Sequence, residues 1–302
     1  MFPVKRVDRS QAEIFVEPLG SKRKYWFSRL RMLFKAEQRN TGEDWAEKVS
    51  CQLCELLGLP HVHYELAEEY DGGQCVGRGV VCKDFVPPWF FLILGNQLLL
   101  QRDPAYPAAG RKYKVHQHTV DAVARVVRPL APPGAESIPP GIVTALDVFV
   151  GYLMLDAWIA NQDRHHENWG ALVSGDELRL APTFDHGASL ARNITDEERI
   201  ERLTTRDRNR TVAYFASRAR SAFYGATAGA RPLITFEAYA AMAALAPEAG
   251  RIWTEQLGRV DGASVRSILD EVPGNRMSRP AREFTIQLLR VNQEHLLQRV
   301  PT

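Results

Sequence analysis

The hydrophobic pattern changes from short apolar segments near the beginning of the chain to longer helical stretches further on. Five segments have the length and apolar content of β-strands: residues 12–17, 25–28, 31–36, 61–67 and 74–82. The last two flank Asp71-Gly72-Gly73, which predicts a hairpin. One helix is expected among these strands, with Thr41 as its N-cap, an apolar stripe from Trp45 to Leu57, and Gly58 as its stop signal.

Helices predominate in the pattern after Trp89. Residues 142–160 are apolar on nearly every face, which predicts a buried helix. Further helices are expected over residues 118–127, 236–245, 247–260, 264–271 and 278–300. The pattern therefore predicts an α+β protein with two lobes: a small β-rich N-lobe with one helix, residues 1–86, and a larger helical C-lobe, residues 87–302.

Composition is consistent with a soluble globular protein. At 302 residues the chain is long for one compact core, so two lobes or two domains are expected. Hydrophobic residues make up 45% and charged residues 25%, which are ordinary values. A formal net charge of +2 is too close to neutral to indicate nucleic acid as a partner.

Membrane insertion and secretion are not expected. The longest apolar run, residues 86–100, is interrupted by prolines and is shorter than the roughly 20 residues that a spanning helix needs. The charged beginning of the chain lacks the apolar core of a signal peptide. Four cysteines fit the reducing cytoplasm. Cys51 and Cys54 form a C-x-x-C within the predicted helix, where core packing is favoured over a metal or redox role.

The polar cluster after the buried helix carries the most chemical information. Asn161 to Gly170 contains Asp163 and Asn168, and a predicted strand-turn-strand around Ser174-Gly175-Asp176 would bring Asp185 back beside Asn168. Phosphoryl transfer requires a carboxylate near the acceptor hydroxyl and oxygen ligands that hold magnesium against the phosphates. Asp163 is the candidate for the first role, and Asn168 with Asp185 for the second.

Protein kinases use the same offsets. Their catalytic-loop Asp precedes a metal-binding Asn by five positions, and a second Asp follows in a D-F-G turn. Asp163 and Asn168 have this spacing, and Asp185-His186-Gly187 stands where D-F-G would. His165 is expected either to orient Asp163 or the phosphates, or to satisfy a buried hydrogen bond. For Arg164 a structural ion pair is preferred.

The N-lobe offers candidates for nucleotide binding. The turn that contains Gly20, Ser21 and Lys22 is dense in positive charge and can cover phosphates, although taken alone it favours a solvated hairpin turn. Lys35 emerges from an apolar strand; it either reaches solvent or bridges the phosphates and pairs with a glutamate of the next helix. Glu47 is the preferred partner and Glu43 the alternative.

The connection between the lobes and one charged segment complete the candidates. Residues 83–88 end in two prolines and predict an extended hinge, so Asp84 and Phe85 are expected beside the adenine of ATP. Residues 188–210 are strongly charged; a solvated helix and loop is favoured, and contact with an acidic or phosphorylated substrate is the alternative.

These motifs carry a resemblance to known kinases. The run Asp163-Arg164-His165-x-x-Asn168 is similar to the D-R-H-x-x-N loop of phosphoinositide kinases. Together with Asn161-x-Asp163-x-His165 and Leu180-Ala181-Pro182-x-x-Asp185, it resembles the HipA-like serine/threonine kinases. The resemblance implies a bilobal protein-kinase-like fold, ATP and Mg²⁺ as cofactors, and a protein serine or threonine as acceptor. It also favours Glu47 as the helix glutamate and suggests autophosphorylation at Ser21.

Three functions compete at this stage. The first is a HipA-like protein kinase, and the second is a kinase of a small molecule such as an antibiotic, a nucleoside, a sugar or a lipid head group. The third is a pseudokinase that binds a nucleotide without catalysis. Phosphorylated residues after incubation with ATP and magnesium would distinguish the first from the others.

Overall fold

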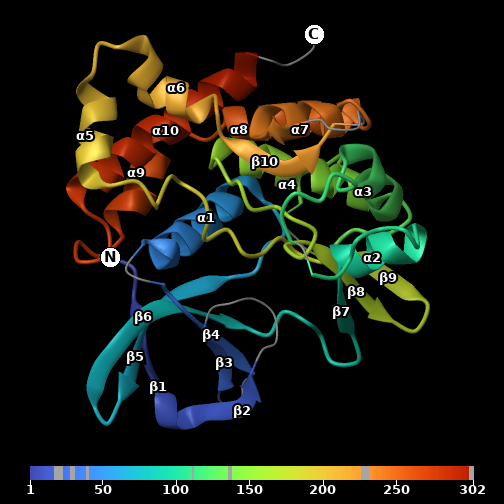
Figure 1. Cartoon of the computed structure of the whole chain (residues 1–302), viewed down its shortest axis with the longest axis horizontal. Coiled ribbons are helices and arrows are strands. Elements are labelled where there is room, and N and C mark those ends of the chain that lie inside the picture. Colours follow the sequence, from blue (N-terminus) through green and yellow to red (C-terminus); the bar gives the residue numbers. More distant parts are fainter. Residues whose placement is uncertain are drawn as a thin grey trace.

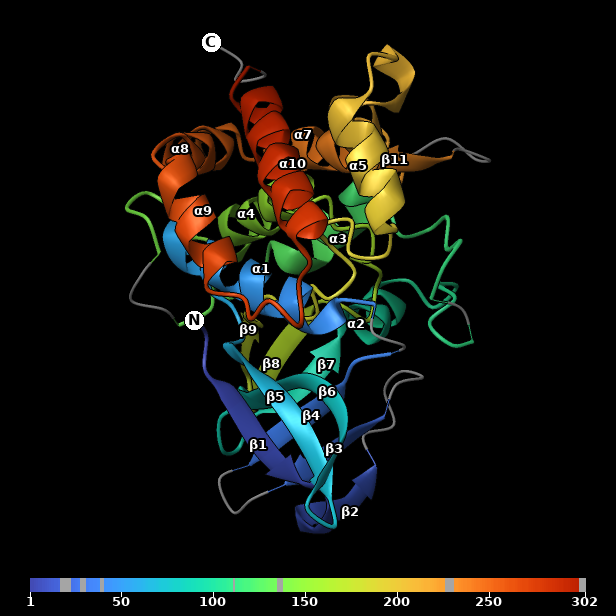
Figure 2. The same ribbon diagram turned by 90° about the vertical axis from the view of Figure 1, so that its left-hand side faces the viewer.

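The computed structural model describes residues 1–16, 23–27, 31–38, 41–110, 112–134, 138–225 and 231–298. Figure 1 shows a strongly twisted sheet that forms one lobe and a larger group of helices that forms the other. Helix α1, Glu43–Leu57, lies between them (Figure 2). The α+β fold with two lobes expected from the hydrophobic pattern is confirmed.

The sheet of the small lobe has six strands in the order β1-β5-β6-β4-β3-β2. Its strands are β1 (Val4–Asp8), β2 (Ala12–Val16), β3 (Lys24–Phe27), β4 (Met32–Ala36), β5 (Tyr64–Asp71) and β6 (Gln74–Lys83). Strand β1 pairs in parallel with β5, and the other neighbours are antiparallel. The five predicted strands are present. Strand β1 escaped prediction because this short edge strand has only two apolar residues, Val4 and Val7.

Helix α1 begins one residue later than the sequence suggested. Its N-cap is Gly42, which has a left-handed backbone with φ of 78° and gives no side-chain cap. The hydroxyl of Thr41, the predicted cap, donates to the Gln38 carbonyl instead. A Cβ at residue 42 would lie 2.2 Å from the Trp45 indole, so glycine is required there. Gly58 ends the helix with φ of 69°, as predicted.

A buried ion pair connects α1 with the helical lobe. The guanidinium of Arg276 pairs with Asp44 in the first turn of α1, and it also donates to the Ala67 carbonyl of β5 at 2.8 Å. Both charged side chains are almost completely inaccessible to solvent. Arg276 therefore fixes the start of α1 against the sheet and against the segment before the last helix.

The helical lobe is built around α4 (Ala145–Trp158), which is buried on nearly every face as the pattern predicted. The other helices are α2 (Gly95–Arg102), α3 (Val120–Val127), α5 (Asp196–Thr204), α6 (Val212–Ala216), α7 (Thr235–Ala243), α8 (Pro247–Gly258), α9 (Gly262–Asp270) and α10 (Arg279–Gln298). Two single-turn 3-10 helices span Arg9–Gln11 and Arg208–Arg210. None of the helices in the described ranges is both long enough and apolar enough to cross a membrane.

Helix α10 supports the carboxyl end of α4 through two hydrogen bonds. The Trp158 indole N–H donates to the Leu289 carbonyl at 3.1 Å, and the Asn292 amide donates to the Trp158 carbonyl at 2.8 Å. All three side chains are buried. The last helix therefore stabilises the end of α4, where the polar loop begins.

Two small sheets lie in the helical lobe, and the sequence predicted only part of them. Strands β8 (Gly170–Ser174) and β9 (Glu177–Leu180) form the expected hairpin, and β7 (Phe91–Leu94) adds to it by pairing with β8. No strand was expected where β7 lies, because the pattern was interpreted as mainly helical from Trp89 onward. Strands β10 (Arg220–Tyr224) and β11 (Pro232–Ile234) were not expected, because strands of three to five residues carry too little periodicity.

Candidate active site

A cavity of about 1170 Å³ lies between the sheet and the helical lobe. All of the predicted site residues that the structure describes line it: Lys35, Glu47, Asp84, Phe85, Asp163, His165, Asn168 and Asp185. Gly20, Ser21 and Lys22 lie outside the described residues. The described residues that sequence analysis selected come from five separate segments, and the fold brings them to one cavity.

The loop that follows α4 is anchored by a buried ion pair. Arg164 is 1% exposed and forms two hydrogen bonds of 2.8 Å with the carboxylate of Asp156 on α4. Its remaining nitrogen donates to the Asn168 carbonyl at 2.9 Å, and Asn161 donates to Asp156 at 2.8 Å. The prediction that Arg164 has a structural role is confirmed. Asp156 was not singled out in the sequence, where it is one acid in an apolar helix.

Asp163 lies in this loop and lines the cavity, and hydrogen bonds hold it in position. Its Oδ1 accepts a hydrogen bond of 2.8 Å from the Tyr113 hydroxyl, and its backbone N–H donates to Asn161. The Asn168 amide N–H₂ donates to the Asp163 carbonyl at 2.7 Å. Tyr113 lies fifty residues away in an irregular segment, so no local pattern could have identified it.

His165 is buried behind Asp163 and is neutral at pH 7. Its Nδ1 accepts a hydrogen bond of 3.1 Å from the Glu167 N–H, and its ring packs edge-on against Tyr113. Burial lowers the pKa of His165 to about 4. The separation of 3.7 Å between Nε2 and the Asp163 carboxylate is too long for a hydrogen bond. The structure thus supports the buried hydrogen bond, and a role in orienting Asp163 remains a prediction.

Lys35 projects from β4 into the cavity. Its Nζ lies 3.0 Å from the Tyr64 hydroxyl and 3.8 Å from Asp185 Oδ1. Burial by itself would lower the pKa of Lys35, but Asp185, Tyr64 and Glu47 outweigh burial and raise it well above its ordinary value. The side chain is therefore an ammonium ion directed at the metal-ligand candidate Asp185.

The predicted ion pair between Lys35 and Glu47 is not formed. Glu47 Oε1 accepts a hydrogen bond of 2.8 Å from the His186 N–H. The alternative, Glu43, forms an ion pair of 2.7 Å with Arg192. Glu47 is occupied in this way because the turn after Asp185 packs directly on α1: a Cβ at Gly187 would lie 3.1 Å from Glu47 Oε2. Glu47 therefore positions the Asp185-His186-Gly187 turn, and it does not hold Lys35 through an ion pair.

Asp185 and Asn168 present oxygen atoms on the cavity wall. Asp185 has a left-handed backbone with φ of 62°, next to the amide that Glu47 binds. Because the Asn168 N–H₂ group faces the Asp163 carbonyl, its amide oxygen is turned the other way. A carboxylate and an amide oxygen are the hard donors that Mg²⁺ prefers, so the residues present fit this ion.

The connection between β6 and β7 forms another wall of the cavity. Asp84 accepts a hydrogen bond of 3.0 Å from the Val86 N–H and forms an ion pair with Arg31, so its carboxylate organises the hinge itself. The Phe85 ring stacks on Phe184 with centroids 5.6 Å apart. The predicted lobe boundary at residues 86 and 87 falls in this connection. Adenine contacts of Asp84 and Phe85 stay a prediction.

Comparisons with known proteins give the fold. No protein-family model and no curated protein sequence matches the chain. Among solved structures, the proinflammatory kinase CtkA of Helicobacter pylori superposes with a TM-score of 0.70 at 19% identity, covering 98% of this chain and 96% of CtkA. HipA of Shewanella oneidensis MR-1, from a toxin–antitoxin complex with HipB and operator DNA, superposes with a TM-score of 0.55 at 10% identity. This match covers 88% of the present chain and 58% of HipA. The resemblance to HipA-like kinases is confirmed at the level of the fold.

Proposed function

We propose that the protein is a phosphotransferase that uses ATP and Mg²⁺ to phosphorylate serine or threonine hydroxyls of a protein. The observation that carries the proposal is the meeting of Lys35, Asp163, Asn168 and Asp185 on one cavity between two lobes. The cavity is large enough for a nucleotide, and its wall near the hinge includes apolar side chains such as Val80 and Phe90.

The residues divide the work of phosphoryl transfer. Asp163 accepts the proton of the acceptor hydroxyl as the oxygen attacks the γ-phosphorus of ATP and the bond to the β-phosphate oxygen breaks. Lys35 supplies positive charge to the phosphates. Asn168 and Asp185 would hold Mg²⁺, which would supply positive charge to the phosphate oxygens. Glu47, through the His186 amide, keeps Asp185 in place.

The kinase fold shared with CtkA and HipA supports phosphoryl transfer. A protein acceptor is favoured by Asn161-x-Asp163-x-His165 together with Leu180-Ala181-Pro182-x-x-Asp185, the combination that resembles the HipA-like serine/threonine kinases. A small-molecule acceptor is the competing outcome. Incubation of the purified protein with ATP and Mg²⁺, followed by mass spectrometry of the protein and of added proteins and metabolites, separates the two outcomes.

The test of the catalytic base is Asp163→Asn, which keeps the size of the side chain but cannot take a proton. We expect phosphoryl transfer to fall by about 10²-fold or more, while the affinity for ATP changes by about twofold at most. Asp176→Asn, in the exposed turn between β8 and β9, is the matched control and should retain full activity. Turnover of Asp163→Asn close to that of the parent would refute the assignment.

A further inference from the structure

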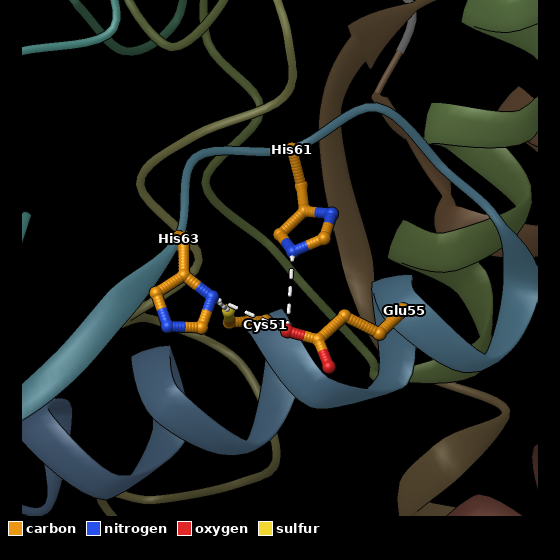
Figure 3. A group of neighbouring side chains, drawn as sticks. All are labelled: Cys51, Glu55, His61 and His63. Atoms are coloured by element: carbon orange, nitrogen blue, oxygen red, sulfur yellow. Dashed lines mark hydrogen bonds and ion pairs between the residues drawn. The ribbon is translucent and has the colours of Figure 1, made fainter. Parts of the chain in front are cut away.

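Four side chains capable of binding a metal ion meet outside the cavity described above. Cys51 and Glu55 lie one turn apart on α1, and His61 and His63 lie in the segment that leads from α1 into β5 (Figure 3). One ligand atom from each residue lies within 4.8 Å of all the others. The group thus offers a sulfur, two nitrogens and a carboxylate oxygen at one point.

Three of the separations between these atoms are close to the edges of a metal-centred tetrahedron. Glu55 Oε1 lies 3.2 Å from His63 Nδ1 and 3.9 Å from His61 Nε2, and Cys51 Sγ lies 3.7 Å from His63 Nδ1. Zinc bonds of about 2.0–2.3 Å in tetrahedral geometry place neighbouring ligand atoms about 3.3–3.6 Å apart. Side-chain rotations that shorten the longer separations, which reach at most 4.8 Å, would allow the four atoms to bind one ion.

Hydrogen-bond acceptors outside the group favour, for both imidazoles, the tautomer that a metal requires. The Leu59 carbonyl accepts from His61 Nδ1 at 2.7 Å, which leaves the Nε2 lone pair directed at Glu55. Glu65 Oε1 lies 2.9 Å from His63 Nε2, and in the tautomer in which Nε2 donates to it the Nδ1 lone pair is directed at Cys51 and Glu55. Carbonyl and carboxylate partners of this kind are typical of metal-bound histidines.

The surroundings allow an ion to reach the site. The side chains of His63 and Glu55 are 53% and 46% exposed, whereas Cys51 is buried beneath them. The Cys51 thiol would release its proton as a metal–sulfur bond forms, because the thiolate is the form that binds a metal. Sulfur and nitrogen donors exclude Mg²⁺ and Ca²⁺, which take oxygen ligands, and favour zinc.

We propose that Cys51, Glu55, His61 and His63 bind one Zn²⁺ ion that ties the second half of α1 to the beginning of β5. Sequence analysis favoured core packing for Cys51, because Cys51 was considered together with Cys54 as a C-x-x-C pair. Cys54 is fully buried and does not belong to the group. Cys51 follows Glu47 by one helical turn, so the ion stiffens the part of α1 next to the residue that positions the Asp185 turn.

The test uses the full-length, reduced protein after treatment with a chelator, and Co²⁺ as a spectroscopic substitute for Zn²⁺. One equivalent of Co²⁺ should give the strong visible bands of a four-coordinate site and a thiolate charge-transfer band, both abolished by Zn²⁺. Excess Mg²⁺ keeps oxygen-ligand sites such as Asp185 occupied. Zn²⁺ alone should raise the thermal midpoint of unfolding, since it binds the folded form.

Variants identify the ligands. Cys51→Ser should lose the charge-transfer band, and His63→Ala should weaken Zn²⁺ binding by at least about tenfold. His63 is exposed, so this variant keeps the fold even if a change at the buried Cys51 does not. The controls Cys75→Ser and His116→Ala change exposed residues outside the group and should bind as the parent does. Absence of a thiolate band, or equal Zn²⁺ affinity of His63→Ala and the parent, would overturn the proposal.

Discussion

The ion pair between Asp156 and Arg164 gives the sharpest prediction about stability. Asp156→Ala removes the carboxylate and leaves the Arg164 guanidinium, 1% exposed, without its counter-charge. Two hydrogen bonds between charged groups are lost, each contributing about 1.5–3 kcal/mol. Breaking a buried pair in this way typically costs about 3–5 kcal/mol. Because domains unfold with about 5–15 kcal/mol, the variant should lose a large part of its stability.

Urea unfolding followed by tryptophan fluorescence and by circular dichroism measures this loss. With a slope near 3 kcal/mol/M, the midpoint of Asp156→Ala should fall by roughly 1–1.7 M. Arg251→Met is the matched control, because Arg251 pairs with two glutamates on the exposed face of α8. Its midpoint should not change measurably.

The double variant Asp156→Leu/Arg164→Met separates the buried charge from other causes. Removing both charges and filling the space with apolar atoms should restore at least half of the lost stability. Phosphoryl transfer should stay low, because the Asn168 carbonyl has still lost its donor and the loop its anchor. A double variant no more stable than Asp156→Ala would show that the stranded charge is not the source of the loss.

Three further predictions concern the site and its surroundings. Asn168→Ala removes a proposed metal ligand and should raise the Mg²⁺ concentration needed for ATP binding by about tenfold or more; an unchanged Mg²⁺ titration would contradict the ligand assignment. Glu47→Ala frees the His186 amide and should lower kcat more than it changes ATP affinity in a steady-state assay, whereas equal losses would point to nucleotide binding. Burial lowers the pKa of His118 to about 3, below its unfolded value near 6.5, so the stability this group contributes is complete above pH 6.5 and lost toward pH 3. His118→Gln should therefore reduce the slope of unfolding free energy against pH by about 1.4 kcal/mol per pH unit between pH 4 and 6, and urea titrations showing equal slopes would contradict this.

The part of the site that is local in sequence was predictable. Asp163, Asn168 and Asp185 are joined by one loop and one hairpin, so their spacing alone placed them together. The predicted role of Arg164 followed from its position beside an acid, and the structure supplies Asp156 as its partner. Lys35 was identified because it emerges from an apolar strand just before a helix that carries glutamates, the arrangement that a kinase needs.

Contacts between distant segments were not predictable. The choice of partner for Lys35 depends on how α1 sits against the Asp185 turn, and packing between the lobes sets that distance, with Asp44 and Arg276 fixing the start of α1. Tyr113 reaches Asp163 from an irregular segment without periodicity. Thr41 met the usual preference for an N-cap, but the close approach of Trp45 requires a glycine at the next position.

The support that α10 gives to the end of α4 has a consequence for how the protein matures on the ribosome. Synthesis proceeds from the amino terminus, so the sheet, α4 and the loop with Asp163 leave the ribosome before α10 exists. Until the Leu289 carbonyl and the Asn292 amide arrive, the last residue of α4 lacks both of these partners. During synthesis the loop with Asp163 therefore lacks the support of α10, and we expect proteolytic loss of α10 to remove that support from a finished molecule.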